Sequence, residues 1–371
     1  MCTRFGVDKM ILYIFAITLL LLVPSRLFIR RQNEDYISKD TCNVVKGVFI
    51  LLIFASHFFN SYSPSVLSPM DQAYTDVRIF LGQCVVSAFL FYSGYGIVES
   101  VKKKGFAYTK ALPRKRILKT LLIYDLSVLI FIAKDIIIRA LGYDVRFDRQ
   151  VLAKSFIALT SAGNDNWYIF VIVCLYAFSW LAFRAFREDG RDRYRAAAVI
   201  TALTLALVFS LKDSGYNRYW YNSMLCYPAG CWFSLFEKDI KPLMKKNYLY
   251  YPLLAGVVFA FVFFQKHWEE RTLYYCLATL LFAVLVILVT MKFSPRNPFL
   301  RYCGVHLNSL FLMHKLPMSL LVLTPISRNH YLHFALSVIL TFVIAFLFEK
   351  LTALVGKAFS ALPKKLKAGG E

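Results

Sequence analysis

The 371-residue chain is 58% hydrophobic and 17% aromatic, with a mean hydropathy of +0.53. Because soluble domains are about 45–50% apolar, this composition excludes a soluble globular protein and predicts a polytopic α-helical membrane protein. The long unbroken apolar runs argue against an outer-membrane barrel, whose strands alternate over about ten residues. The net charge of +22 lies in short loops between apolar runs, so orientation in a membrane explains it better than nucleic-acid binding.

The apolar runs predict an all-α bundle of about eleven transmembrane helices. We expect no metal site, because the eight cysteines show no ligand spacing. The first span, with its link, forms residues 1–39 and is interpreted as a retained helix in front of a ten-helix domain at 40–356. A basic tail follows at 357–371. The predicted spans are residues 10–29, 44–59, 78–98, 117–133, 167–183, 196–211, 219–236, 248–264, 272–291, 305–326 and 333–356.

The charges of the loops alternate along the chain. Residues 99–116, 184–195 and 237–246 and the C-terminal tail are rich in Lys and Arg, whereas residues 60–77 contain neither. Since cytoplasmic loops carry the excess of basic residues, we expect the basic loops and the C-terminus in the cytoplasm, and residues 60–77 and the N-terminus outside.

A lysine and a histidine stand in one apolar span, KGVFILLIFASH, as Lys46 and His57. At ~3.6 residues per turn and ~1.5 Å rise, they share a helix face about 16 Å apart. An ionisable residue inside a span is a functional candidate by default, and a histidine can act as a general base at neutral pH. The structural alternative is a snorkelling lysine and a histidine that bonds to a neighbouring helix.

Two segments near the cytoplasmic side follow. The stretch FLFYSGYG places Ser93 and Tyr95 among small residues, which suits either close helix packing or a role in the site. Further on, Arg114, Lys115 and Arg116 follow Pro113, where we expect a helix to begin. Guanidinium groups and a helix start both bind phosphate; the alternative is an orientation signal that contacts anionic lipids.

Later segments carry polar and aromatic residues. Asn166, Trp167 and Tyr168 open a predicted span, and they form either a platform for a sugar or an interfacial aromatic belt with helix-capping residues. His314 lies at a depth similar to that of His57; whether the two histidines pair stays open. The remaining outer histidines are expected to be solvated: His267, His330 and His333.

These segments, in this order, resemble the acyltransferase 3 family of integral membrane acyltransferases. The matching segments are Lys46 with His57, FLFYSGYG at 89–96, Arg114 with Arg116, the pair Trp167–Tyr168, and NSLFLMHKLP at 308–317. The family has arginine at the place of Lys46; the lysine form occurs in the branch similar to fucose 4-O-acetylase and related sugar acetylases. The extra first helix is a second departure.

The resemblance implies an O-acyltransferase that moves an acyl group, acetyl by preference, from acetyl-CoA to a hydroxyl of a polysaccharide or lipid-linked sugar of the cell envelope. It also implies a bacterial inner membrane location, no permanently bound cofactor, and His57 as the catalytic histidine. Lys46 orients the donor or balances charge, and Arg114, Lys115 and Arg116 contact the donor. The expected substrate contacts are Ser93, Tyr95, Asn166, Trp167, Tyr168 and His314.

Two other classes of function stay open. A transporter of a lipid or small solute would also contain many helices and buried ionisable residues, but it predicts repeat symmetry and paired broken helices, which the sequence does not show. The second alternative is a partner-dependent subunit without catalysis.

Overall fold

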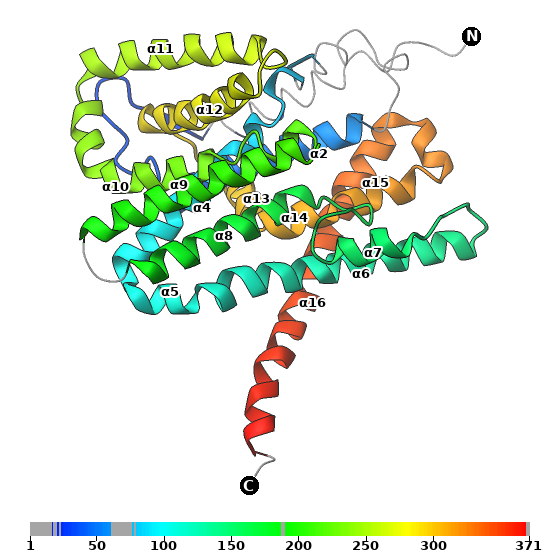
Figure 1. The fold of residues 1–371 in the computed structure, drawn as a ribbon. Coiled ribbons are helices and arrows are strands. Elements are labelled where there is room, and N and C mark those ends of the chain that lie inside the picture. Colours follow the sequence, from blue (N-terminus) through cyan, green and yellow to red (C-terminus); the bar gives the residue numbers. More distant parts are fainter. Residues whose placement is uncertain are drawn as a thin grey trace, which may run out of the picture. The chain divides into compact units, whose positions relative to one another are not determined.

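The computed structural model describes residues 17, 21, 24–60, 76–77, 79–186 and 190–368, with the backbone alone for residues 190 and 358–368. In this part of the chain the structure is almost entirely helical (Figure 1). Its two strands, β1 (Arg26–Leu27) and β2 (Phe293–Ser294), pair antiparallel, with Arg26 opposite Ser294. The predicted all-α fold is confirmed. The predicted span at 10–29 and the predicted outer loop at 60–77 lie largely outside the described residues, but the described end of that span is not helical, because Arg26–Leu27 form β1.

The chain divides into two compact units. The first comprises Met1–Leu118 and Phe170–Val305, and the second comprises Lys119–Ile169 and His306–Glu371. In chain order, the α-helices of the described residues of both units are α2 (Lys39–Phe59), α4 (Cys84–Lys104), α5 (Phe106–Leu112), α6 (Lys119–Ala140), α7 (Arg149–Ser155), α8 (Trp167–Ala185), α9 (Gly190–Asp213), α10 (Cys226–Met244), α11 (Asn247–Lys266), α12 (Thr272–Lys292), α13 (Pro298–Val305), α14 (Leu307–Met313), α15 (Lys315–Leu321) and α16 (His330–Ala368). The described residues also form the π-helix η2 (Pro113–Leu118) and the 3₁₀ turns η3 (Arg218–Trp220) and η4 (Pro325–Arg328).

Seven helices in the described residues are long and apolar enough to cross a membrane. They coincide with seven of the predicted spans: Lys39–Phe59, Ile79–Lys104, Trp167–Ala185, Arg191–Asp213, Asn247–Lys266, Thr272–Lys292 and His330–Lys357. Such runs satisfy all backbone hydrogen bonds internally, as hydrocarbon requires. The chain is therefore a polytopic membrane protein.

Three other predicted spans take different forms. The span expected at 117–133 is one helix, α6, whereas the span expected at 219–236 begins with η3 and continues as α10 only from Cys226. The continuous span expected at 305–326 is wrong, because the short helices α14 and α15 and the start of η4 replace it.

The break between α14 and α15 has a local cause. The side chain of His314 bonds to the carbonyl oxygen of Phe311, with 2.8 Å from Nδ1 to that oxygen, and so competes for a helical acceptor. Pro317 has no N–H and cannot donate to the carbonyl of residue 313. Both features disfavour regular α-helical hydrogen bonds between α14 and α15.

Glycines allow close contact between two helix pairs of the first unit. A Cβ atom on Gly94 of α4 would lie 2.0 Å from the carbonyl oxygen of Tyr227, and one on Gly230 of α10 would lie 2.0 Å from that of Phe91. Gly47 of α2 and Gly304 of α13 make the same kind of approach, at 1.9 and 1.8 Å. Small residues of this kind are what lets membrane helices pack backbone against backbone. Of the two interpretations of FLFYSGYG, close helix packing is thus observed at Gly94.

Candidate active site

Helix α2 of the first unit carries both Lys46 and His57. The helix begins at Ser38, whose side chain accepts a hydrogen bond from the backbone N–H of Thr41 at 3.2 Å, which is the usual N-cap contact. It runs without interruption to Phe59, so the two residues lie on one continuous helix as expected. Both side chains are half-buried, and each therefore keeps some access from outside the bundle.

The ammonium of Lys46 faces an aromatic ring rather than a carboxylate. Its Nζ lies 5.8 Å from the centroid of the Tyr92 ring, within the range of a cation–π contact. The Tyr92 hydroxyl is buried and has no hydrogen-bond partner in the described part of the chain. Lys46 is also within electrostatic range of the Arg116 guanidinium.

Tyrosines also surround Arg116. Its Nε donates to the hydroxyl of Tyr108 at 3.2 Å, and its guanidinium carbon lies 5.9 Å from the centroid of the Tyr176 ring. Ser93 is a hydrogen-bonding neighbour of Tyr176. The first unit thus brings Lys46, Ser93 and Arg116 into one neighbourhood.

This neighbourhood has an excess of positive charge. Among the described residues, neither Lys46 nor Arg116 forms an ion pair with a carboxylate. Two cations held near each other by aromatic and phenolic partners repel, and an anion placed between them relieves that repulsion. We call Lys46, Arg116, Tyr92, Tyr108 and Tyr176 the cationic cluster.

The expected helix start after Pro113 is wrong. Helix α5 ends at Leu112, Pro113 keeps helical angles (φ −56°, ψ −46°), and the π-helix η2 leads directly into α6. The wider turn accommodates a proline that has no N–H to donate, and π-turns of this kind are frequent at functional sites. The run of Arg114, Lys115 and Arg116 therefore offers exposed side chains but no free helix N-terminus.

Tyr95 belongs to a different set of contacts. Its hydroxyl donates to Oε2 of Glu237 at 2.8 Å, while the hydroxyl of Tyr36 donates to Oε1 of the same carboxylate at 2.7 Å. Burial, and then the bond to Glu237, raises the pKa of Tyr36 well above its usual value, so Tyr36 remains a neutral donor. The predicted substrate contact of Tyr95 stays a prediction.

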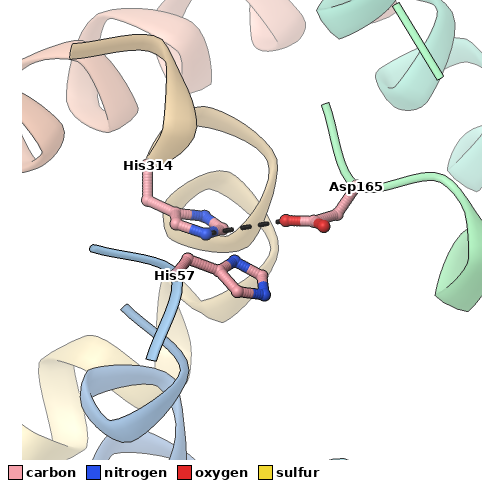
Figure 2. A group of neighbouring side chains, drawn as sticks. All are labelled: His57, Asp165 and His314. Carbon is pink, nitrogen blue, oxygen red and sulfur yellow. Dashed lines mark ion pairs between the residues drawn. The ribbon is translucent and has the colours of Figure 1, made fainter. Parts of the chain in front are cut away.

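The second unit contains a buried charged group around His314. His314 is 1% exposed, and the side chain of Asp165 is 7% exposed. Nε2 of His314 lies 3.5 Å from Oδ2 of Asp165 (Figure 2), and Nζ of Lys315 lies 2.5 Å from Oδ1. Figure 2 also labels His57, which belongs to the first unit.

An aromatic series connects the predicted acceptor residues of this unit. Trp167 packs edge-on against Tyr168, Tyr168 packs edge-on against Phe311, and Phe311 contacts His314, with centroid separations of 5.9, 5.7 and 6.0 Å. Asn166 instead holds the preceding loop, because its Nδ2 donates to the carbonyl oxygen of Ala158 at 2.9 Å. The unit therefore brings Trp167, Tyr168 and His314 together. The Asn166 amide instead stabilises the loop that precedes α8.

Sequence reasoning left Asp165 and Lys315 out of the site. Asp165 stands in GNDNW just before Asn166, and Lys315 stands beside His314 in MHKLP. The available signal was one carboxylate and one ammonium close to predicted spans, since charges inside a membrane domain usually pair.

Two further histidines of the second unit are not simply solvated. His333 is fully buried, with its Nε2 3.3 Å from the carbonyl oxygen of Met318, so the expected exposure of His333 is wrong. His306 lies 2.7 Å from both oxygens of Glu349, which also accepts from Ser309 at 2.8 Å. These contacts join α14 and α15 to α16.

Comparison with known proteins supplies the family. A family model described as an acyltransferase domain matches residues 41–350, which includes nearly all of both units. Searches of curated proteins and of solved structures found no significant match. With its membrane-spanning helices, the chain is thus a membrane acyltransferase and belongs to the acyltransferase 3 family.

Proposed function

We propose that this membrane acyltransferase moves an acetyl group from acetyl-CoA to a hydroxyl of a polysaccharide or lipid-linked sugar of the cell envelope. The observation that carries the proposal is the cationic cluster, in which Lys46 and Arg116 have aromatic partners and no carboxylate among the described residues. Such a cluster suits a polyanionic donor, and coenzyme A carries several phosphates. The family match favours this enzyme over the alternative of a transporter.

The donor is bound through its phosphates. Arg116 offers a planar guanidinium, which pairs with phosphate oxygens bidentately, and Lys46 adds a point charge. Arg114 and Lys115 are exposed on the π-turn and attract the same phosphates from solution. Ser93 lies next to the cluster through Tyr176 and lines the path of the donor.

The acetyl group is transferred in two balanced steps. His57 accepts the proton of the acceptor hydroxyl as the hydroxyl oxygen attacks the thioester carbonyl carbon. The tetrahedral intermediate then expels the thiolate of coenzyme A as the carbon–sulfur bond breaks, and the imidazolium of His57 returns the proton to sulfur. A histidine is suited to both steps at neutral pH.

The acceptor is a sugar. Trp167 and Tyr168 offer apolar ring faces, and His314 offers a polar ring beside them. Aromatic rings with a nearby hydrogen-bonding group suit a hydroxylated ring. In this proposal the protein lies in a bacterial inner membrane with its C-terminus in the cytoplasm, so that donor and acceptor approach from opposite sides.

The test is transfer of label from acetyl-CoA by the purified protein in detergent or nanodiscs, with envelope glycan from cells lacking the gene as acceptor. Replacing His57 by alanine removes the base and lowers the rate on the order of 10²- to 10⁴-fold. His267→Ala is the matched control, since that histidine is exposed and pairs locally with Glu270. Transfer by folded His57→Ala protein at the wild-type rate would refute the assignment.

A further inference from the structure

We propose that Asp165 is a positioning residue for acyl transfer: its buried carboxylate holds the imidazole of His314 in one orientation, with Nε2 protonated, on the acceptor side of the site. This inference rests on the proposed function, in which His314 contacts the acceptor. The residues that carry it all belong to the second unit.

The hydrogen bond at Nδ1 fixes the tautomer of His314. A carbonyl oxygen only accepts, so the 2.8 Å contact with the carbonyl of Phe311 requires Nδ1 to carry a proton. Nε2 is then the only ring nitrogen whose protonation can change. Nε2 is also the atom that lies 3.5 Å from Oδ2 of Asp165.

The charge of Asp165 favours one of the two states of Nε2. A carboxylate only accepts, so it repels a lone pair on Nε2 and attracts an N–H. The separation exceeds the 2.7–3.2 Å of an ordinary N–H···O bond, so the attraction is that of two opposite charges in a poorly screened interior. In this orientation Nε2–H can donate to a hydroxyl oxygen of the acceptor.

The loop before α8 fixes the carboxylate in place. Nδ2 of Asn164 donates to Oγ of Ser127 on α6 at 3.0 Å, and Nδ2 of Asn166 donates to the carbonyl of Ala158 at 2.9 Å. Asp165 stands between these two anchored residues and is itself buried. Such restraint from neighbouring groups is what a positioning residue needs.

The contact with Lys315 offers a competing explanation for the buried carboxylate of Asp165. The Nζ of Lys315 lies 2.5 Å from Oδ1 of Asp165, so the carboxylate could be present only to neutralise a lysine. The two explanations differ in what happens when both charges are removed together. If Asp165 serves Lys315 alone, loss of both residues restores function; if it serves His314, function stays lost.

The experiment compares Asp165→Asn, Lys315→Met and the double variant of the full-length protein. Acetyl-CoA binding is measured by calorimetry, and kcat and KM for transfer are measured with the glycan acceptor described above. We expect Asp165→Asn to lower kcat on the order of 100-fold while the Kd for acetyl-CoA is unchanged. Lys315→Met has a much smaller effect, and the double variant is as slow as Asp165→Asn.

Each outcome decides the proposal. A double variant with the wild-type kcat would overturn it, as would an Asp165→Asn variant within threefold of wild type. If Asp165→Asn does not fold because Lys315 is left unpaired, the double variant, neutral at both positions, carries the test alone. Absence of transfer by the wild-type protein would instead refute the proposed function, so the two failures are distinguishable.

Discussion

The two units differ in the partners of the ionisable side chains at their candidate sites. In the first, the half-buried Lys46 and the exposed Arg116 face tyrosines; in the second, the histidines His314 and His306 face carboxylates. A cation without a counter-charge remains available for an anionic ligand, whereas a histidine beside a carboxylate is held in place by that contact. The difference matches the proposed division between donor binding and acceptor chemistry.

The largest predicted effect comes from the packing that supports the first unit. Gly94 lies next to Ser93 on α4, and a Cβ atom there would be 2.0 Å from a backbone carbonyl oxygen that cannot rotate away. We expect Gly94→Ala to force α4 and α10 apart and to cost about 3 kcal/mol of stability, measured as a lower unfolding midpoint in detergent. Gly96→Ala is the control, since nothing lies within 4 Å of its Cβ position; equal midpoints for the two variants would contradict the packing described.

The next effect tests whether the cations of the first unit await an anion. Lys46→Met and Arg116→Met should each weaken acetyl-CoA binding by roughly 10- to 100-fold, the range of a charge-assisted hydrogen bond. Calorimetry measures the Kd. The control is Lys245→Met, which removes an exposed cation that already pairs with Glu34. Equal losses for all three variants would mean that general positive charge, rather than the cationic cluster, attracts the donor.

The smallest effect concerns cations of the first unit that do have a carboxylate. Lys241 and Lys245 both pair with exposed Glu34, at 2.7 and 2.8 Å, and these hydrogen bonds lower the pKa of Glu34 from 4.5 to about 2. Because the pKa is lowered on folding, the stabilisation is present above pH 4.5 and is lost as the pH falls through about 2.

Replacing Glu34 by glutamine tests whether the stabilisation by Glu34 decreases as the pH falls. We expect a loss below about 1 kcal/mol at neutral pH, since water screens an exposed pair, and no loss near pH 2 relative to wild type. Unfolding midpoints measured across that pH range test it. A difference that grows toward low pH would contradict the direction of the pKa shift.

Much of the fold follows from the sequence because hydrocarbon imposes one rule. A run of apolar residues of bilayer length must be helical, and this rule alone locates the seven spans that the structure shows in its described part. It fails at 305–326, where the side chain of His314 takes a backbone acceptor and Pro317 lacks a donor. A separate expectation, that a helix begins after Pro113, fails because the π-helix η2 continues the helix through the proline.

The site was only partly predictable for a different reason. Lys46 and His57 stand out because they interrupt an apolar run, so local sequence suffices to find them. Asp165 and Lys315 lie 150 positions apart, and a single sequence contains nothing that links them. His333 was expected to be solvated because it stands near the end of a span, yet its contact with Met318 depends on how α15 packs against α16.

The central claim is that His57 drives acetyl transfer to an envelope glycan. Mass spectrometry of surface glycans from cells carrying the wild-type gene, no gene, or the His57→Ala gene tests it most directly. Glycans one acetyl group heavier are expected only with the wild-type gene. Acetylated glycan from His57→Ala cells with equal protein levels, or no difference between wild-type and deleted cells, would contradict it.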